Sequence, residues 1–196
     1  MGYNPYGVDE PVNKQGKLVA SPNWNTDWKK TIINENAYKV QHGVSVSGGG
    51  EKTSFYFGSN YLREEGQVKT TYFERVATRL KVDTQVKEFI ETGLNISYTS
   101  SKQNSPNQSG SAFSNSIQWI YSLPSYYPLY RRNNNGELIT QNGKVFILDY
   151  GGNNSQTVNG VRPALSGENA YGAIVNNEIL NRNNYICLLY TSPSPR

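Results

Sequence analysis

The sequence predicts an all-β protein: an antiparallel up-and-down meander that forms an incomplete section of a transmembrane β-barrel, with a long extracellular loop containing a short helix. Three observations support this fold class. Between residues 38 and 101, four segments alternate apolar and polar side chains with a period of two, as strands with two different faces do. Each segment has about ten residues or more, the length that crosses a bilayer as a tilted strand. Short and long connections alternate, as they do at the two ends of outer-membrane barrels.

The four segments cover residues 38–48, 52–62, 71–85 and 88–101, and the second alternates least regularly. A turn at 48–51 joins the first pair and a tight turn at 83–88 joins the last pair, whereas the connection 63–71 is longer. We expect one four-stranded section of barrel wall at 38–101, antiparallel throughout and open at both edges. Residues 181–186 are predicted to begin the next strand.

Alternation assigns the side chains of these segments to two faces. One face carries Val44, Val46, Leu80, Val82, Leu94 and Ile96. The other carries five charges: Arg75, Arg79, Lys81, Asp83 and Glu91. A basic side chain on the lipid side costs about 2–4 kcal/mol near the bilayer midplane, so we expect these charges to face the lumen. Cross-strand ion pairs would offset their desolvation there.

Nothing in the sequence predicts catalysis. No nucleophile or metal-ligand spacing accompanies the charged cluster, so we expect no catalytic residue, no metal site and no cofactor. The lone His42 falls on the apolar face near the outer end of its segment, where an interfacial histidine is expected.

Composition agrees with a wall that meets lipid on one side only. Hydrophobic residues make up 36% of the chain and the mean hydropathy is −0.66, which argues against a large buried core. No apolar run is long enough for a transmembrane helix. The formal charge of +4 is spread thinly, so nucleic-acid binding gains no support. The N-terminus lacks the basic start and apolar core of a signal peptide, and an exported protein would therefore lack its beginning here.

Residues 1–37 are predicted to be an irregular segment leading into the barrel, with one short hairpin among its Gly, Pro, Asn and Asp residues. Around Trp28 and Ile32 the sequence allows a short helix capped by Asn25 or Thr26, or a packing turn. The packing turn is the favoured alternative.

Residues 102–180 are predicted to form the long extracellular loop. Phe113, Ile117, Ile120 and Tyr121 recur at helical spacing, which predicts a helix over 111–123 capped by Ser109 or Ser111 and stopped by Pro124. A small hairpin is expected through 138–139 and 145–148, a loosely held stretch at 153–163, and a helical turn after 169. Flat amphipathic rings can stack on sugars or apolar side chains, or simply pack the loop. Both roles remain open for Trp119, Tyr121, Tyr126, Tyr127 and Tyr130.

A set of motifs, taken in order, resembles the start of the barrel in the SusC/RagA class of TonB-dependent outer-membrane transporters. The similarity covers about residues 2–186 and is strongest between 36 and 100. The motifs are Asn4-Pro5-Tyr6-Gly7, Asp27-Trp28, Asn36-Ala37-Tyr38, Val44-Ser45-Val46-Ser47-Gly48-Gly49, Glu51-Lys52-Thr53-Ser54-Phe55-Tyr56, Gly58, Tyr61-Leu62, Glu65-Gly66, Phe73-Glu74-Arg75 and Arg79-Leu80.

The resemblance implies a fragment of a transporter that imports oligosaccharides or peptides across the cell outer membrane. Its implied partners are outer-membrane lipid, a SusD-like surface lipoprotein that acts as a lid, a glycan or peptide substrate, and the TonB complex. In that family the TonB complex acts on a plug domain, and no part of this chain matches the plug or the TonB box. The alternative is a soluble all-β glycan-binding module, which would have to bury its apolar face against a second sheet.

Residues 187–196 are predicted to be a non-native tail. The sequence Cys-Leu-Leu-Tyr-Thr-Ser-Pro-Ser-Pro-Arg is what TGT CTC TTA TAC ACA TCT CCG AGC CCA CGA encodes, and this resembles one frame of a transposon-derived sequencing adapter. We therefore expect these residues to belong to no folded element and the barrel to be cut short before them. Cys187, the sole cysteine, then carries no information on redox compartment.

Overall fold

The computed structural model describes residues 5–106, 115–133, 136–143, 145–152, 162, 164–176 and 179–195. The chain divides into two compact units. The sheet unit comprises Asn36–Ser105 and Leu180–Arg196, and the loop unit comprises Met1–Glu35 and Pro106–Ile179.

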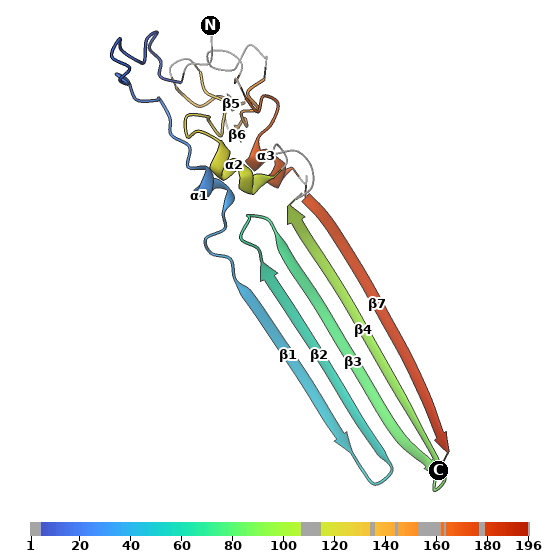
Figure 1. Ribbon diagram of the computed structural model, residues 1–196. Helices are drawn as coiled ribbons and strands as arrows, with labels where there is room; N and C mark the ends of the chain where they lie inside the picture. Colours follow the sequence, from blue (N-terminus) through green and yellow to red (C-terminus); the bar gives the residue numbers. More distant parts are fainter. Residues whose placement is uncertain are drawn as a thin grey trace. The chain divides into compact units, whose positions relative to one another are not determined.

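The sheet unit is a single sheet of five long strands in the order β1-β2-β3-β4-β7. The strands are β1 (Lys39–Gly49), β2 (Thr53–Glu65), β3 (Tyr72–Lys87), β4 (Ile90–Pro106) and β7 (Ile179–Pro195). Strands β1 to β4 pair as consecutive antiparallel neighbours, so the predicted meander is confirmed. The expectation of an open edge at β4 is wrong, because β7 lies beside β4 and its arrow runs the opposite way (Figure 1).

The register gives the sheet two chemically different faces. Val46 pairs with Phe57, Phe57 with Leu80, and Leu80 with Ile96, and paired residues project to the same side of a sheet. We call this side the apolar face. The opposite side, which we call the polar face, carries Arg75, Arg79, Lys81, Asp83 and Glu91. The alternation in the sequence therefore assigned both sets of residues to faces correctly.

β7 includes most of residues 187–196, which were expected to belong to no helix or strand. It runs to Pro195, so the expectation that residues 187–196 belong to no folded element is wrong. Leu188, Leu189 and Tyr190 are compatible with a strand, and β7 is the edge strand of the sheet, where a proline removes no donor that the sheet interior needs. The non-native origin of this tail stays a prediction.

The described residues of the loop unit form three short helices: α1 (Trp28–Ile32), α2 (Ser116–Ser122) and α3 (Ala170–Val175). A two-stranded sheet pairs β5 (Thr140–Gln141) with β6 (Val145–Phe146), which confirms the predicted small hairpin. The core of the loop unit consists of apolar side chains from segments far apart in the sequence. They are Trp24, Trp28, Ile32, Trp119, Leu123, Tyr127, Ala170 and Ile174.

Two expectations for these helices need correction. Residues around Trp28 form a helix and not a packing turn, because the Asp27 carboxylate accepts a hydrogen bond from the Lys30 amide at 2.9 Å and caps it. α2 begins at Ser116, where Asn115 accepts from the amides of Ile117 and Gln118. Its cap is thus neither Ser109 nor Ser111, which lie outside the described residues, and its buried aromatic residue is Trp119.

Candidate functional site

The charged side chains of the polar face form short-range pairs along the sheet. Lys81 Nζ lies 2.7 Å from the Asp83 carboxylate, two residues away on the same strand. The Arg79 Nε donates to the Asn95 side-chain oxygen at 3.1 Å. Both pairs remain partly open to solvent, so each contributes little by itself. Among the described side chains of the polar face, these pairs supply charged and hydrogen-bonding groups and no activated nucleophile.

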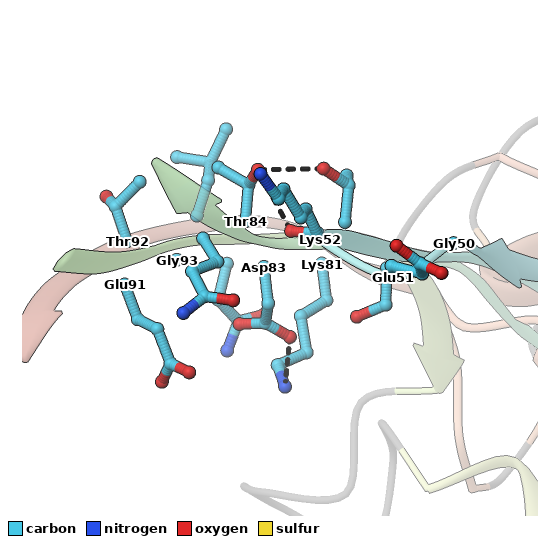
Figure 2. Close-up of a pocket in the computed structure, with 14 residues that line it drawn as sticks. Gly50, Glu51, Lys52, Lys81, Asp83, Thr84, Glu91, Thr92 and Gly93 are labelled. Atoms are coloured by element: carbon cyan, nitrogen blue, oxygen red, sulfur yellow. Dashed lines mark hydrogen bonds and ion pairs between the residues drawn. The ribbon is translucent and has the colours of Figure 1, made fainter. Parts of the chain in front are cut away.

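A recess of about 530 Å³ lies at the turn end of the sheet, lined by residues of the β1–β2 turn, β2, β3 and β4. Figure 2 shows Glu91, Asp83 and Lys81 on one side of the sheet, and Thr92 and Thr84 on the other. The recess therefore spans the end of both faces. Of its two lysines, Lys52 and Lys81, Lys81 lies on the polar side together with Asp83 and Glu91 and is paired with Asp83.

A shallower recess of about 400 Å³ crosses the middle of the strands. Its floor on the polar face consists of small residues, namely Gly43, Gly58 and Ala77. The Tyr56 ring leans over Gly58, and a Cβ added at Gly58 would come within 2.6 Å of the Tyr56 hydroxyl. The absence of a side chain at Gly58 thus leaves the space that the Tyr56 ring occupies on the polar face.

The apolar face is exposed, although its side chains are those of a core. Val44 is 64% exposed, Val46 is 52% exposed and Phe55 is 43% exposed. Val86, Ile90 and Tyr98 are exposed as well. Soluble proteins rarely leave so many neighbouring apolar side chains in water. This face requires an apolar environment.

The structure does not bring the five aromatic residues of the loop together as one surface. Trp119 is 1% exposed and Tyr127 is 3% exposed, so they pack the loop and do not present a free ring face to a ligand. Trp119 meets Trp28 edge to face with ring centroids 6.3 Å apart. Tyr121 is 85% exposed, while Tyr126 and Tyr130 are partly buried.

A buried polar centre in the loop unit was missed by the sequence analysis. Arg162 is 2% exposed and donates to the carbonyl oxygens of Asp149 and Glu168. Its guanidinium carbon also lies 5.3 Å from the centroid of the Tyr127 ring. Gly151 leaves the space that the guanidinium fills and has a φ of +61°. The only signal in the sequence that could have indicated this centre is Arg162 itself, within the stretch 153–163 that was predicted to be loosely held.

Burial raises the pKa of the Asp149 carboxyl, and the nearby Arg162 opposes that rise. The Arg162 Nε lies 4.0 Å from the Asp149 carboxylate, which is long for an ion pair, so burial prevails. Burial also raises the pKa of the Tyr127 hydroxyl. Because these groups are linked to backbone atoms, we assign them a structural role.

Neither metal binding nor a spanning helix is found in the part of the chain that the structure describes. Its His, Cys, Asp and Glu residues form no group of three that could hold a metal ion. Among the same residues, no helix is long and apolar enough to cross a membrane.

Comparison with protein-family models gives no match. The chain is 37% identical over 83 residues to TonB-dependent receptor P39 of Formosa agariphila, which covers 42% of this chain and 8% of that protein. It is 29% identical over 97 residues to TonB-dependent receptor P26 of the same organism, covering 47% of this chain and 10% of that protein. The matched region is thus a tenth or less of either relative. Together with the open antiparallel sheet, these similarities support the TonB-dependent receptor family for this chain.

Proposed function

We propose that this chain is a section of the barrel wall of a SusC/RagA-type TonB-dependent transporter in the cell outer membrane. The exposed apolar face carries this proposal, because a continuous row of Val, Phe, Leu and Ile side chains needs lipid or a second sheet to cover it. In the proposed orientation the apolar face meets lipid, and Arg75, Arg79, Lys81, Asp83 and Glu91 face the lumen. The lumen would hold a plug domain on which the TonB complex acts.

We infer that the substrate is an oligosaccharide or a peptide and that a SusD-like lipoprotein covers the outer opening. The loop unit supports this inference through its aromatic side chains. Tyr121 has the most exposed ring of the five aromatics, and Tyr126 and Tyr130 are partly exposed. Trp119 and Tyr127 would act as packing that holds this loop in shape.

The membrane role is tested with the full-length protein expressed in a Gram-negative host. We expect it in the outer-membrane fraction, with a band on electrophoresis that shifts on heating, as folded barrels show. A glycan-binding module without a membrane role would remain in the soluble fraction, which would overturn the proposal.

The substrate role is tested by uptake of labelled oligosaccharides and peptides in cells that carry Tyr121→Ala. We expect weaker uptake with unchanged amounts of folded protein, because an exposed ring is lost and the core is untouched. Ile117→Ala is the matched control, since Ile117 lies one turn away on α2 and is 38% exposed. Equal uptake by both variants and the native protein would remove Tyr121 from the ligand surface.

A further inference from the structure

Arg75 and Arg79, in the middle of the polar face, have no acid beside them. The acids of this face on β2 and β3 are Glu64 and Asp83. A lysine of β1 lies 2.9 Å from Glu64, and Lys81 lies 2.7 Å from Asp83, so both acids are already matched. Among the described side chains, Arg75 and Arg79 form no ion pair. The middle of the polar face therefore carries two positive charges that nothing on this face balances.

The second of these arginines lies at the recess of about 400 Å³ that crosses the strands. Arg79 pairs with Gly58 on one side and with Ser97 on the other, and Ser45 pairs with Gly58, so these four residues form one row on the polar face. The neighbouring row of the same recess contains Asn60. Hydroxyl and amide groups thus surround the guanidinium, and each can form hydrogen bonds with a ligand.

Two glycines leave room for the side chains at the edge of this recess. A Cβ added at Gly43 would lie 3.3 Å from the side-chain nitrogen of Asn60, just as one at Gly58 would meet the Tyr56 hydroxyl. Tyr56 is still 42% exposed. The recess therefore presents an aromatic ring and an amide close to the sheet, together with the guanidinium of the next strand.

The contacts of Arg79 leave part of its guanidinium open. Its Nε donates to the Asn95 side-chain oxygen at 3.1 Å, which is a neutral partner. The two terminal nitrogens have no hydrogen-bond or ion-pair partner among the described side chains. Such a pair of nitrogens matches the two oxygens of a carboxylate or a sulfate. Arg75 offers a second guanidinium on the same face, four residues or about 13 Å farther along β3.

We propose that the middle of the polar face binds an oligosaccharide that carries carboxylate or sulfate groups. Arg79 and Arg75 bind two acid groups of this ligand, the Tyr56 ring packs on a sugar ring, and Asn60 hydrogen-bonds to sugar hydroxyls. This inference rests on the proposed function, because the polar face has to line a lumen that the substrate crosses. It narrows the substrate from oligosaccharides or peptides in general to acidic sugars.

The mixture of groups favours a sugar over a protein acid as the ligand. A carboxylate from a protein needs only a guanidinium, whereas this recess also offers an amphipathic ring and several hydrogen-bonding groups. Sugars use both kinds of group, because their rings have apolar faces and their hydroxyls donate and accept. Two unbalanced arginines facing a lumen also attract anions over some distance, which helps an acidic ligand to enter.

The test measures binding by the full-length protein, purified in detergent from outer membranes and showing the heat-shifted band of a folded barrel. The probes are fluorophore-labelled hexagalacturonate and its neutral methyl ester, and a sulfated galactan hexamer and its desulfated counterpart. Fluorescence anisotropy gives the dissociation constant of each. A labelled hexaglutamate peptide tests the other acidic ligand class.

We expect at least one acidic sugar to bind more tightly than its neutral counterpart. Arg79→Gln should weaken binding of the acidic form about tenfold and leave the neutral form unchanged, because one charge-assisted contact is lost. Arg75→Gln should act in the same direction. Arg79→Lys should lie between, since it keeps the charge and loses the fork of donors.

Two further variants separate the roles of the charge and the ring. Tyr56→Ala should weaken the acidic and the neutral form alike, because the ring packs on the sugar and not on its acid group. Lys81→Gln combined with Asp83→Asn is the matched control: it removes a base on the same strand and face together with its acid. The preference for the acidic form should then be unchanged. If Arg79→Gln does not assemble, Arg79→Lys replaces it in the comparison.

Each contrary result overturns a different statement. Equal binding of acidic and neutral forms, or binding of no sugar, by folded protein would overturn this inference and leave the membrane role intact. The same holds if hexaglutamate alone depends on the two arginines. An unchanged preference in the Arg75→Gln, Arg79→Gln double variant, with faster proteolysis of the plug, would mean that the arginines bind an acid of the plug. Absence of the native protein from the outer membrane would overturn the proposed function itself.

Discussion

The two units of this chain use the same kinds of side chain in opposite ways. In the loop unit, Trp28, Ile32 and Trp119 are each at most 3% exposed and pack on one another. In the sheet unit, Val44, Val46 and Phe55 stand exposed on one face. The contrast indicates that the loop unit buries its apolar side chains in a core of its own. The apolar side chains of the sheet unit instead require apolar surroundings.

The largest expected effect is in the core of the loop unit. Trp119→Ala should destabilise this unit by about 3–5 kcal/mol, because it removes a fully buried ring from between α1 and α2. Hydrogen exchange of the loop amides in the full-length protein measures the loss. Ile117→Ala on the same helix should change little, and similar effects of both variants would contradict the assigned core.

The second-largest effect is expected in the sheet unit. A charged side chain is usually tolerated on an exposed surface, but here it should impair insertion when it lies on the apolar face. Leu80→Arg should reduce the amount of inserted protein, because an arginine near the midplane of the lipid face costs about 2–4 kcal/mol. Arg79→Leu, one residue away on the polar face, should be tolerated for insertion and alter only the lumen. The heat-shifted fraction in outer membranes measures both. Equal loss in the two variants would contradict the assignment of faces.

These two predictions differ in how far the sequence supports them. The faces of Leu80 and Arg79 could be predicted, because a period of two depends on neighbouring residues alone. The core around Trp119 could not be predicted. It brings residues near position 28 into contact with residues near position 119, and contacts between distant segments produce no periodic pattern in the sequence. The sequence accordingly predicted an irregular segment and a loop where the structure has one unit. For the same reason the sequence left open whether Trp119 and Tyr127 contact a ligand or pack the loop.

A smaller effect is expected at the start of α2. Asn115→Ala should destabilise this helix by about 1 kcal/mol, because the Asn115 side chain accepts from two amides that otherwise lack helical partners. Asn115→Asp should retain the cap and is the matched control. Faster exchange at the Ile117 and Gln118 amides in the alanine variant alone is the expected readout. Unchanged exchange would show that packing of Trp119 suffices to hold the helix.

The smallest expected effect depends on pH and on Asp149, where burial and Arg162 act against each other. Because the pKa of Asp149 is raised in the folded state, the folded protein takes up this proton at a higher pH than the unfolded chain. Its contribution to the stability of the loop unit should therefore increase as the pH falls through the raised pKa towards the ordinary value of about 3.9. Asp149→Asn retains an acceptor for the Gly151 amide and removes the titration. The variant should be at least as stable as the native protein at pH 7, and its advantage should vanish on acidification, as followed by hydrogen exchange corrected for intrinsic rates. A variant much less stable at pH 7 would mean that the attraction between Asp149 and Arg162 outweighs burial, and the loop unit would then depend on a buried ion pair as well as on its tryptophans.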